Sequence, residues 1–330
     1  MKRFLPDTFT LMLLTTVALA SVFPLAGAGV DYFRLATKIA IGLLFFLHGA
    51  RLSRDVMMKG LLHWRLHLAI LSSTFVLFPV LGLLIGLLPG SFLPPTLYTG
   101  ILYLCVLPST VQSSIAFTSM AQGNVPASIV AASGSNLIGM FLTPLLAGLL
   151  LSVGGHGGFN AGALEDIAVQ LLAPFLLGQF LQPWIGDFIR ARKNLLMPVD
   201  RGSILMVVYL AFSESVTQGL WHMLSLRDIG VVVTVDISLL MAVLVITTFA
   251  SRWLGFSRED EISIVFCGSK KSLASGVPMA NAIFAGQAIG GIVLPLMLFH
   301  QIQLMVCAVL AKRYLARGKG ENAAERLNGA

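Results

Sequence analysis

The sequence predicts an all-α polytopic membrane protein with ten transmembrane helices, arranged as a five-plus-five inverted repeat that contains two crossing broken helices. The first observation is the composition, with 56% hydrophobic residues, 11% charged residues and a mean hydropathy of +0.87. Soluble proteins carry about 25% charged residues, so the chain falls outside that class. A transmembrane barrel would show shorter segments of alternating polarity, and none is seen. The other two observations are ten long apolar runs and matching interruptions in two of them.

Each of the ten apolar runs is close to the length of about 20 residues that a helix needs to cross a bilayer. The first run, preceded by Lys2 and Arg3, is also similar to a cleavable signal peptide, but the topology described below works with the run retained. We expect one integral membrane domain over residues 1–330, with repeats at about 1–153 and 160–315 and a disordered cytoplasmic tail at 316–330. The runs lie near 8–29, 33–50, 66–88, 96–121, 125–151, 165–186, 203–221, 229–250, 261–286 and 288–311.

The basic residues indicate the orientation in the membrane. Most of the 22 lie at the start, in alternate loops or in the tail, and an excess of this kind is typical of cytoplasmic loops. Both termini are therefore placed in the cytoplasm, as an even number of crossings requires. The net charge of +7 follows from this topology and needs no nucleic-acid partner. The clustered residues are Lys2, Arg3, Arg51, Arg54, Lys59, Arg65, Arg190, Arg192, Lys193, Arg201, Arg252, Arg258, Lys312, Arg313, Arg317, Lys319 and Arg326.

Two runs are interrupted in the same way. One reads TGILYLCVLPSTVQSSIAFTSMAQG and the other ISIVFCGSKKSLASGVPMANAIFAG. In each, an apolar half ends at a cysteine, Cys105 or Cys267, a polar centre follows, and a second apolar half closes on Gly123 or Gly286. Each is followed by one apolar run that contains a proline. Because five runs precede the midpoint and five is odd, the second half must enter the membrane from the opposite side, which defines an inverted repeat.

The interruptions mark a candidate binding site. Pro108 cannot donate a backbone hydrogen bond, and Gly268 and Gly276 permit bends. Backbone groups freed at such breaks are tolerated within a membrane only where protein buries them or water reaches them. Paired broken helices near the bilayer midplane point to the binding site of a secondary transporter. The alternative is a pair of kinked helices that serve only in packing.

The two breaks carry an unusual set of polar side chains. A lysine at the bilayer centre costs about 2.5–3.5 kcal/mol on insertion scales, so Lys270 and Lys271 are expected to face a cavity or a partner. Glu214 and Thr74 are candidate coupling residues. Glu214 pairs with a lysine or carries a proton, or else lies near the outer end of its helix. A single serine in a membrane helix is often only a small packing residue. The candidate set is Gln112, Ser113, Ser114, Ser133, Ser135, Asn136, Ser269, Lys270, Lys271 and Ser272.

These features resemble the bile acid:sodium symporter family. The run LCVLPSTVQSSIAFTSMAQGNVPASI is similar to the fourth segment of that family, and GSKKSLASGVPM is similar to its SBF-like branch of bacterial symporters. The resemblance extends from about residue 8 to residue 313. It implies a multi-pass protein of the cell membrane, the inner membrane in a bacterium. It also implies alternating access, an organic anion as substrate and coupling to sodium.

The resemblance also assigns sodium-site positions, and several of them are altered. The family's Ser-Asn pair matches Ser113 and Ser114, and its hydroxyl ligands in the following segment match the neighbourhood of Ser133, Ser135 and Asn136. The shared glutamate and the glutamine after it match Ser269 and Leu273, and a second glutamine matches Thr74, five residues before Pro79. We therefore expect the fold to be kept and the binding of two sodium ions to be lost. The lysines would act as tethered cations, as a contact to an anionic substrate, or as a protonation switch.

The sequence thus predicts a secondary active transporter that moves a small organic anion, without enzymatic activity and without a cofactor. Sodium is the one ion that the resemblance offers, and the lysines argue against it. No Walker loop appears, so ATP is not expected as a partner. The alternatives are a sodium-coupled symporter with a modified site, a channel or non-transporting regulator, and an intramembrane hydrolase that pairs Ser269 or Ser272 with a lysine.

Overall fold

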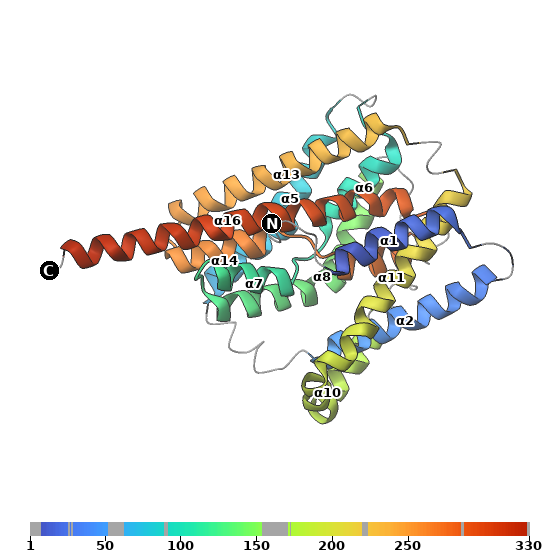
Figure 1. The fold of residues 1–330 in the computed structure, drawn as a ribbon, viewed down its shortest axis with the longest axis horizontal. Helices are drawn as coiled ribbons and strands as arrows, with labels where there is room; N and C mark the ends of the chain where they lie inside the picture. The colour runs from blue at the N-terminus through green and yellow to red at the C-terminus, as the bar shows by residue number, and fades with distance from the viewer. Residues whose placement is uncertain are drawn as a thin grey trace.

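The computed structural model describes residues 8–25, 27, 29–51, 63–88, 92–153, 171, 173–219, 224–284 and 287–328. Every regular element in these ranges is a helix, which confirms the all-helical prediction (Figure 1). Predictions that involve Lys2, Arg3, Arg54, Lys59 and Gly286 lie outside the described residues. Residues 165–170 and 172, at the start of the expected run at 165–186, also lie outside them.

The helices follow the apolar runs. In the first half they are α1 (Thr8–Val22), α2 (Gly29–Arg51), α4 (Trp64–Ser72), η2 (Ser73–Leu77), α5 (Phe78–Ile85), α6 (Pro95–Val106), α7 (Gln112–Met120) and α8 (Val125–Val153). In the second half they are α10 (Ala173–Ala191), α11 (Lys193–Thr217), α13 (Leu226–Trp253), α14 (Arg258–Gly268), α15 (Leu273–Ile283) and α16 (Gly290–Asn328). Among the described residues, five helices are long and apolar enough to cross a membrane: 64–85, 125–150, 196–217, 226–253 and 290–317. The count of ten crossings stays a prediction.

The interruptions fall where the sequence places them. Helix α6 ends at Val106, the next residue Leu107 is extended with φ −72° and ψ 152°, and α7 starts at Gln112. In the second half, α14 ends at Gly268 and α15 starts at Leu273, with the Ser272 hydroxyl accepting a hydrogen bond from the Ser275 N–H as the N-cap. Both runs are therefore pairs of half-helices joined by non-helical backbone.

The helices form two groups, which we call the four-helix group and the core group. The four-helix group consists of α1, α2, α10 and α11, which lie together at one side of the molecule in Figure 1. The core group contains α4 to α8 and α13 to α16. Helices α2 and α10 approach so closely that a Cβ atom on Gly49 would overlap the Phe175 carbonyl oxygen, and one on Gly178 would overlap that of Phe46. Glycines that allow such backbone contact are typical of helix pairs in membranes.

The last helix of the structure extends beyond the last apolar run. Helix α16 continues without interruption through residues 316–328 and ends at Asn328. Residues 316–328 include alanine, arginine, glutamate and leucine, which favour a helix, together with Gly318 and Gly320, which do not.

Candidate functional site

The two helix breaks lie against each other and exchange hydrogen bonds. The Ser109 hydroxyl donates to the Cys267 carbonyl at 2.5 Å, and the Ser272 N–H donates to the Pro108 carbonyl at 2.9 Å. The Ser114 hydroxyl donates to the Phe266 carbonyl at 3.0 Å. Each break thus supplies donors to backbone carbonyls freed at the other, which satisfies polar groups that neither lipid nor a regular helix could satisfy.

Lys271 lies at the centre of this crossing and is fully buried. Its ammonium donates to three carbonyl oxygens, those of Thr74, Cys105 and Leu107, each at 2.8 Å. The ammonium also lies 4.1 Å from the centroid of the Phe78 ring, within range of a cation–π interaction. All three N–H donors of the lysine are therefore used, and the positive charge is enclosed by oxygen atoms as a hard metal cation would be.

The backbone explains why the Thr74 carbonyl is available. Within η2 the hydrogen bonds skip one residue further than in an α-helix, so the Phe78 N–H donates to Ser73 rather than to Thr74. The corresponding donor for the Thr74 carbonyl would be residue 79, which is a proline and has no N–H. The Thr74 carbonyl is left without a helical partner and turns to Lys271. The Thr74 hydroxyl donates to the Ile70 carbonyl of the preceding helical turn.

The Cys105 carbonyl is freed in a comparable way. Its helical donor would be the Ser109 N–H, which instead donates to the Ser135 hydroxyl on α8 at 3.1 Å. Helix α6 has ended before that point because residue 108 is a proline. The two breaks and the bulge in η2 therefore create the oxygen cage that the lysine occupies.

Gln303 fixes the Lys271 backbone and was missed by the sequence reasoning. Its side-chain oxygen accepts from the Lys271 N–H at 2.9 Å, and its side-chain nitrogen donates to the Lys271 carbonyl at 3.0 Å. The residue is fully buried on α16. A glutamine within an otherwise apolar run was the available signal, since a buried amide requires partners.

Lys270 is also fully buried but extends to a different set of partners. Its ammonium donates to the Ser113 carbonyl at 2.9 Å and lies 3.9 Å from the centroid of the Phe117 ring and 5.3 Å from that of Phe266. Fewer carbonyl oxygens surround this charge than surround Lys271. Aromatic faces provide part of its stabilisation.

The serine and asparagine candidates mostly join the two breaks. The Asn136 amide donates to the Ser109 carbonyl at 2.6 Å and accepts from the Ser275 hydroxyl at 2.8 Å. The Ser113 and Ser114 hydroxyls both contact the Thr110 hydroxyl. The structure therefore brings Ser113, Ser114, Ser135, Asn136 and Ser272 together with the lysines.

Three other candidates take a smaller part or none in this network. The Ser269 hydroxyl bonds back to the Val265 carbonyl of its own helix at 2.6 Å. Ser133 is half-buried on α8, and none of the described residues forms a hydrogen bond with its side chain. Glu214 lies elsewhere and accepts from Arg34 at 2.6 Å, so the structure pairs it with an arginine of α2 rather than with either lysine.

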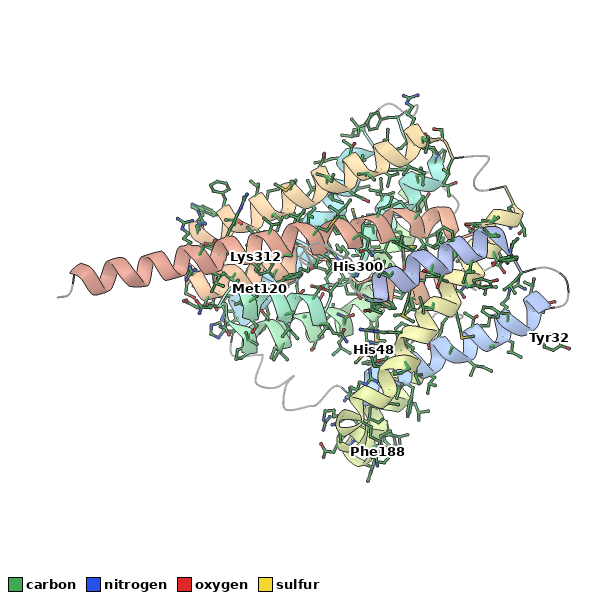
Figure 2. All side chains as sticks on the ribbon, viewed as in Figure 1. Tyr32, His48, Met120, Phe188, His300 and Lys312 are labelled. Atoms are coloured by element: carbon green, nitrogen blue, oxygen red, sulfur yellow. The ribbon has the colours of Figure 1, made fainter. Side chains whose placement is uncertain are left out.

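A polar cavity of about 220 Å³ lies beside the crossing, between the four-helix group and the core group. The N-termini of α7 and α15 open into it through Gln112 and Leu273, and both half-helix N-termini carry partial positive charge. Basic side chains from three more helices line the same space, the guanidinium groups of Arg51 and Arg201 and the imidazoles of His48 and His300. Figure 2 shows His48 and His300 near the middle of the molecule, where the two groups meet.

Among the residues that line this cavity, Arg51 has the side chain best suited to bind an anion. One of its terminal nitrogens donates to Asp200 on α11 at 2.5 Å. Its Nε and its other terminal nitrogen are buried and have no hydrogen-bond partner among the described residues. A guanidinium with two unused donors beside a polar cavity is suited to bind a carboxylate or a sulfonate. Neither Lys270 nor Lys271 is among the residues that line the cavity, so the lysines lie behind it.

Asp236 is a second polar residue that the sequence reasoning did not single out. It is fully buried on α13, and both carboxyl oxygens lack a hydrogen-bond partner among the described residues. An ionised carboxylate in that environment would be very unfavourable, so we expect the group to be protonated. Its sequence signal was a single acidic residue within the apolar run near 229–250.

Replacing Asp236 with asparagine is therefore expected to change stability little, by about 1 kcal/mol or less, because a neutral carboxyl and an amide have similar size. Thermal unfolding of the purified variant in detergent measures this. A loss of about 3–5 kcal/mol would instead indicate a buried charge that had lost its partner, and the neutral assignment would fail.

The comparison with known families decides the class of protein. The model of the SBF-like CPA transporter family matches residues 7–316. The chain belongs to this family. "Uncharacterized protein PA2026" of Pseudomonas aeruginosa is 57% identical over 96% of this chain and 95% of its own length, and "Putative symporter YfeH" of Escherichia coli is 54% identical over 95% of both chains. "Sodium/bile acid cotransporter 7" of Danio rerio is 26% identical over 83% of this chain and 82% of its own length.

The family assignment confirms the resemblance and identifies a membrane transporter rather than an enzyme. The structure agrees with the second point for the serine–lysine pairs considered above. The Lys270 and Lys271 ammonium groups donate to backbone carbonyls, and the Ser269 and Ser272 hydroxyls bond within α14 and at the start of α15. None of these contacts places a lysine as the base for a serine nucleophile.

Proposed function

We propose that this member of the SBF-like CPA transporter family is a secondary transporter that moves an organic anion by alternating access, without the coupling to two sodium ions that the family resemblance implies. The observation that carries the proposal is the Lys271 ammonium, held by three backbone carbonyls at 2.8 Å where the two breaks meet. Lys271 acts there as a tethered cation. Lys270 provides a second fixed charge beside the first break.

A tethered ammonium excludes sodium for two reasons. It already occupies the three carbonyl oxygens at the crossing, which are then not available to a sodium ion, and its charge repels a second cation within a few ångströms. The positions that would supply anionic or amide ligands in the family hold Ser269, Leu273 and Thr74 instead. The site therefore keeps the positive charge that holds the breaks together but no longer depends on an ion from solution.

The cavity supports an organic anion as the substrate. Two half-helix N-termini and the guanidinium groups of Arg51 and Arg201 line it, and the one acidic residue among the described residues that line it, Asp200, is paired with Arg51, so an anionic group would be attracted. The Danio rerio relative is named as a bile acid cotransporter, and a bile acid is an amphipathic organic anion. Binding of a substrate of this class beside Arg51 is therefore part of the proposal.

The proposed mechanism uses the two helix groups. Ten crossings in two inverted repeats, with both termini in the cytoplasm, would place the crossing of the breaks near the bilayer midplane. The cavity lies at the boundary between the groups, so movement of one group against the other would open it to alternate sides. From the distribution of basic residues we expect the side that carries Arg51 and Arg201 to face the cytoplasm.

Flux into reconstituted vesicles tests the coupling. Uptake of a radiolabelled conjugated bile acid is measured with an inward sodium gradient and with choline in place of sodium. We expect equal initial rates and exchange of internal for external substrate in both media. Strict sodium dependence with two ions for each substrate would refute the proposed coupling, and absence of any exchange would refute the proposed substrate class.

A further inference from the structure

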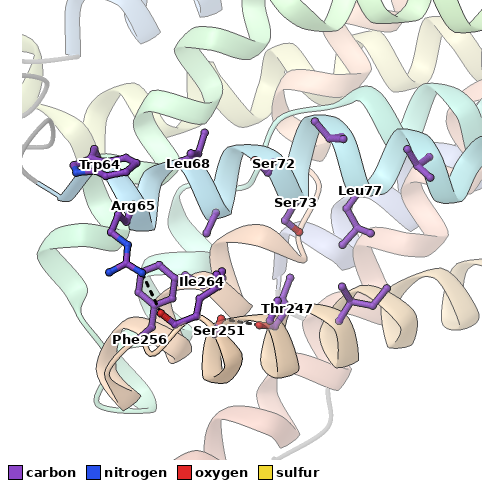
Figure 3. Close-up of a pocket in the computed structure, with 16 residues that line it drawn as sticks. Trp64, Arg65, Leu68, Ser72, Ser73, Leu77, Thr247, Ser251, Phe256 and Ile264 are labelled. Atoms are coloured by element: carbon purple, nitrogen blue, oxygen red, sulfur yellow. Dashed lines mark hydrogen bonds between the residues drawn. The ribbon is translucent and has the colours of Figure 1, made fainter.

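An apolar groove of about 550 Å³ lies on the outside of the core group, away from the polar cavity (Figure 3). One wall is the continuous helix α4–η2–α5, and the other is formed by α13, by Leu254 and Phe256 in the connection that follows it, and by Ile264 of α14. Figure 3 shows Leu68, Ser72 and Leu77 following one another along the first wall. Wall residues such as Val76 and Val80 are half-exposed, with 59% and 47% of their surface accessible. Both walls belong to helices that are apolar enough to cross a membrane, so the groove opens toward lipid acyl chains.

One end of the groove has the features of a membrane boundary. Trp64 at the start of α4 and Trp253 at the end of α13 are both largely exposed, and tryptophans concentrate at the level of lipid head groups. A polar pocket of about 270 Å³ continues the groove at this end and shares Trp64, Arg65 and Phe256 with it. The apolar groove and the polar pocket are thus arranged in the same order as the acyl chain and the head group of a lipid.

Arg65 supplies the charge at this boundary. One terminal nitrogen donates to the Leu254 carbonyl at 3.1 Å, and the guanidinium lies 5.4 Å from the centroid of the Phe256 ring. No carboxylate among the described residues pairs with it, so most of its donors face the polar pocket or solvent. Asp260 lies in the same pocket but is already engaged, because it accepts from the Asn124 amide at 2.8 Å. A phosphate is an anion that the remaining N–H donors of such a fork-shaped guanidinium bind well.

The inner part of the groove contacts the functional site. Ser73 lines it and donates to the Gly268 carbonyl, the last residue of α14, at 2.9 Å. Ser73 is also the first residue of η2, whose next residue, Thr74, gives its carbonyl to Lys271. A molecule in the groove would therefore lie against the segment that shapes the oxygen cage.

From these observations we infer that the groove is a binding site for one membrane phospholipid, with an acyl chain between α4–α5 and α13 and its phosphate on Arg65. The lipid fills the space beside η2 and α14 and stabilises their contact. Its phosphate provides affinity through charge-assisted hydrogen bonds, and its acyl chain provides affinity through van der Waals contacts with the groove walls.

Native mass spectrometry of the purified full chain in detergent tests this site, with phosphatidylethanolamine added as the probe. We expect one retained phospholipid in the wild-type protein and about tenfold weaker retention of diacylglycerol, which has the acyl chains but no phosphate. Arg65→Gln should weaken phospholipid retention about tenfold, and Ala69→Phe should do the same by filling the groove. Matched controls are Arg192→Gln, at an exposed arginine stacked on Phe188, and Ala36→Phe, at an exposed position of α2.

Unchanged retention in both test variants would overturn the site. A loss in Ala69→Phe alone, with diacylglycerol bound as well as phospholipid, would overturn the role of Arg65. Thermal unfolding with added phosphatidylethanolamine provides an independent measurement, since stabilisation is expected in the wild-type protein and in the controls but not in the test variants. Equal stabilisation in all of them would count against the proposal even if Arg65→Gln expressed poorly.

Discussion

Lys271→Ala is expected to reduce the stability of the protein by about 3–5 kcal/mol, which would be a large share of a typical folding free energy. The variant leaves three buried carbonyls, those of Thr74, Cys105 and Leu107, without the ammonium that joins them. Hydrogen bonds to charged groups contribute about 1.5–3 kcal/mol each, and water entering the vacated space would offset part of the sum. The measurement is thermal or denaturant-induced unfolding of the purified protein in detergent.

The matched control is Lys38→Ala, because Lys38 is an exposed lysine on α2 and its loss should change stability little. The loss of stability in Lys270→Ala should lie between the losses in Lys271→Ala and Lys38→Ala. The Lys270 ammonium donates to one carbonyl, that of Ser113, and otherwise contacts aromatic rings. If Lys271→Ala were as stable as Lys38→Ala, the charge would not hold the crossing together.

Arg51→Gln is expected to raise the KM for an anionic substrate about tenfold to a hundredfold with a smaller change in kcat. The reason is the loss of the two unused guanidinium donors at the cavity, since charge-assisted hydrogen bonds to a bound anion contribute about 1.5–3 kcal/mol. The measurement is concentration-dependent uptake of a conjugated bile acid into vesicles that contain the purified variant.

Arg51 also bonds to Asp200, so the variant needs a control for stability. The double variant Arg51→Gln with Asp200→Asn replaces the ion pair by two neutral groups and avoids leaving a carboxylate unpaired. It should unfold at a temperature closer to wild type than Arg51→Gln alone while keeping the raised KM. Arg192→Gln removes an exposed arginine at the end of α10 and should leave KM unchanged. A normal KM in the double variant would remove Arg51 from substrate binding.

The broken helices could be predicted because their causes are local in sequence. Pro108 ends α6 wherever it is placed, and the polar residues around Lys270 and Lys271 stand out within an apolar run. The cost of charge in a membrane also predicted that the two lysines would face a cavity or a partner, and the structure gives both of them partners. These features depend on neighbouring residues and on the bilayer as solvent, and both can be inferred from one sequence.

The partners of those residues could not be predicted, since they depend on tertiary packing. The sequence alone does not show that the Lys271 ammonium donates to the Thr74 carbonyl in η2. It also does not show that Gln303 of α16 bonds to the Lys271 backbone. Pro79, five residues after Thr74, leaves the Thr74 carbonyl free only because the hydrogen bonds of η2 skip one residue further than in an α-helix. The π-helical bulge itself could not be inferred from the sequence. The role that we propose for Arg51 was hidden for a similar reason, because a basic residue at a helix end is first interpreted as a topology signal.

Equilibrium binding of radioactive sodium to the purified protein tests the central claim most directly, because it needs no knowledge of the substrate. The wild-type protein is expected to show no saturable sodium binding, because the Lys271 ammonium already occupies the three carbonyl oxygens. Lys271→Ala frees those oxygens and is expected to gain sodium binding, together with stabilisation by sodium that choline does not reproduce. Saturable binding of two sodium ions to the wild-type protein would contradict the account.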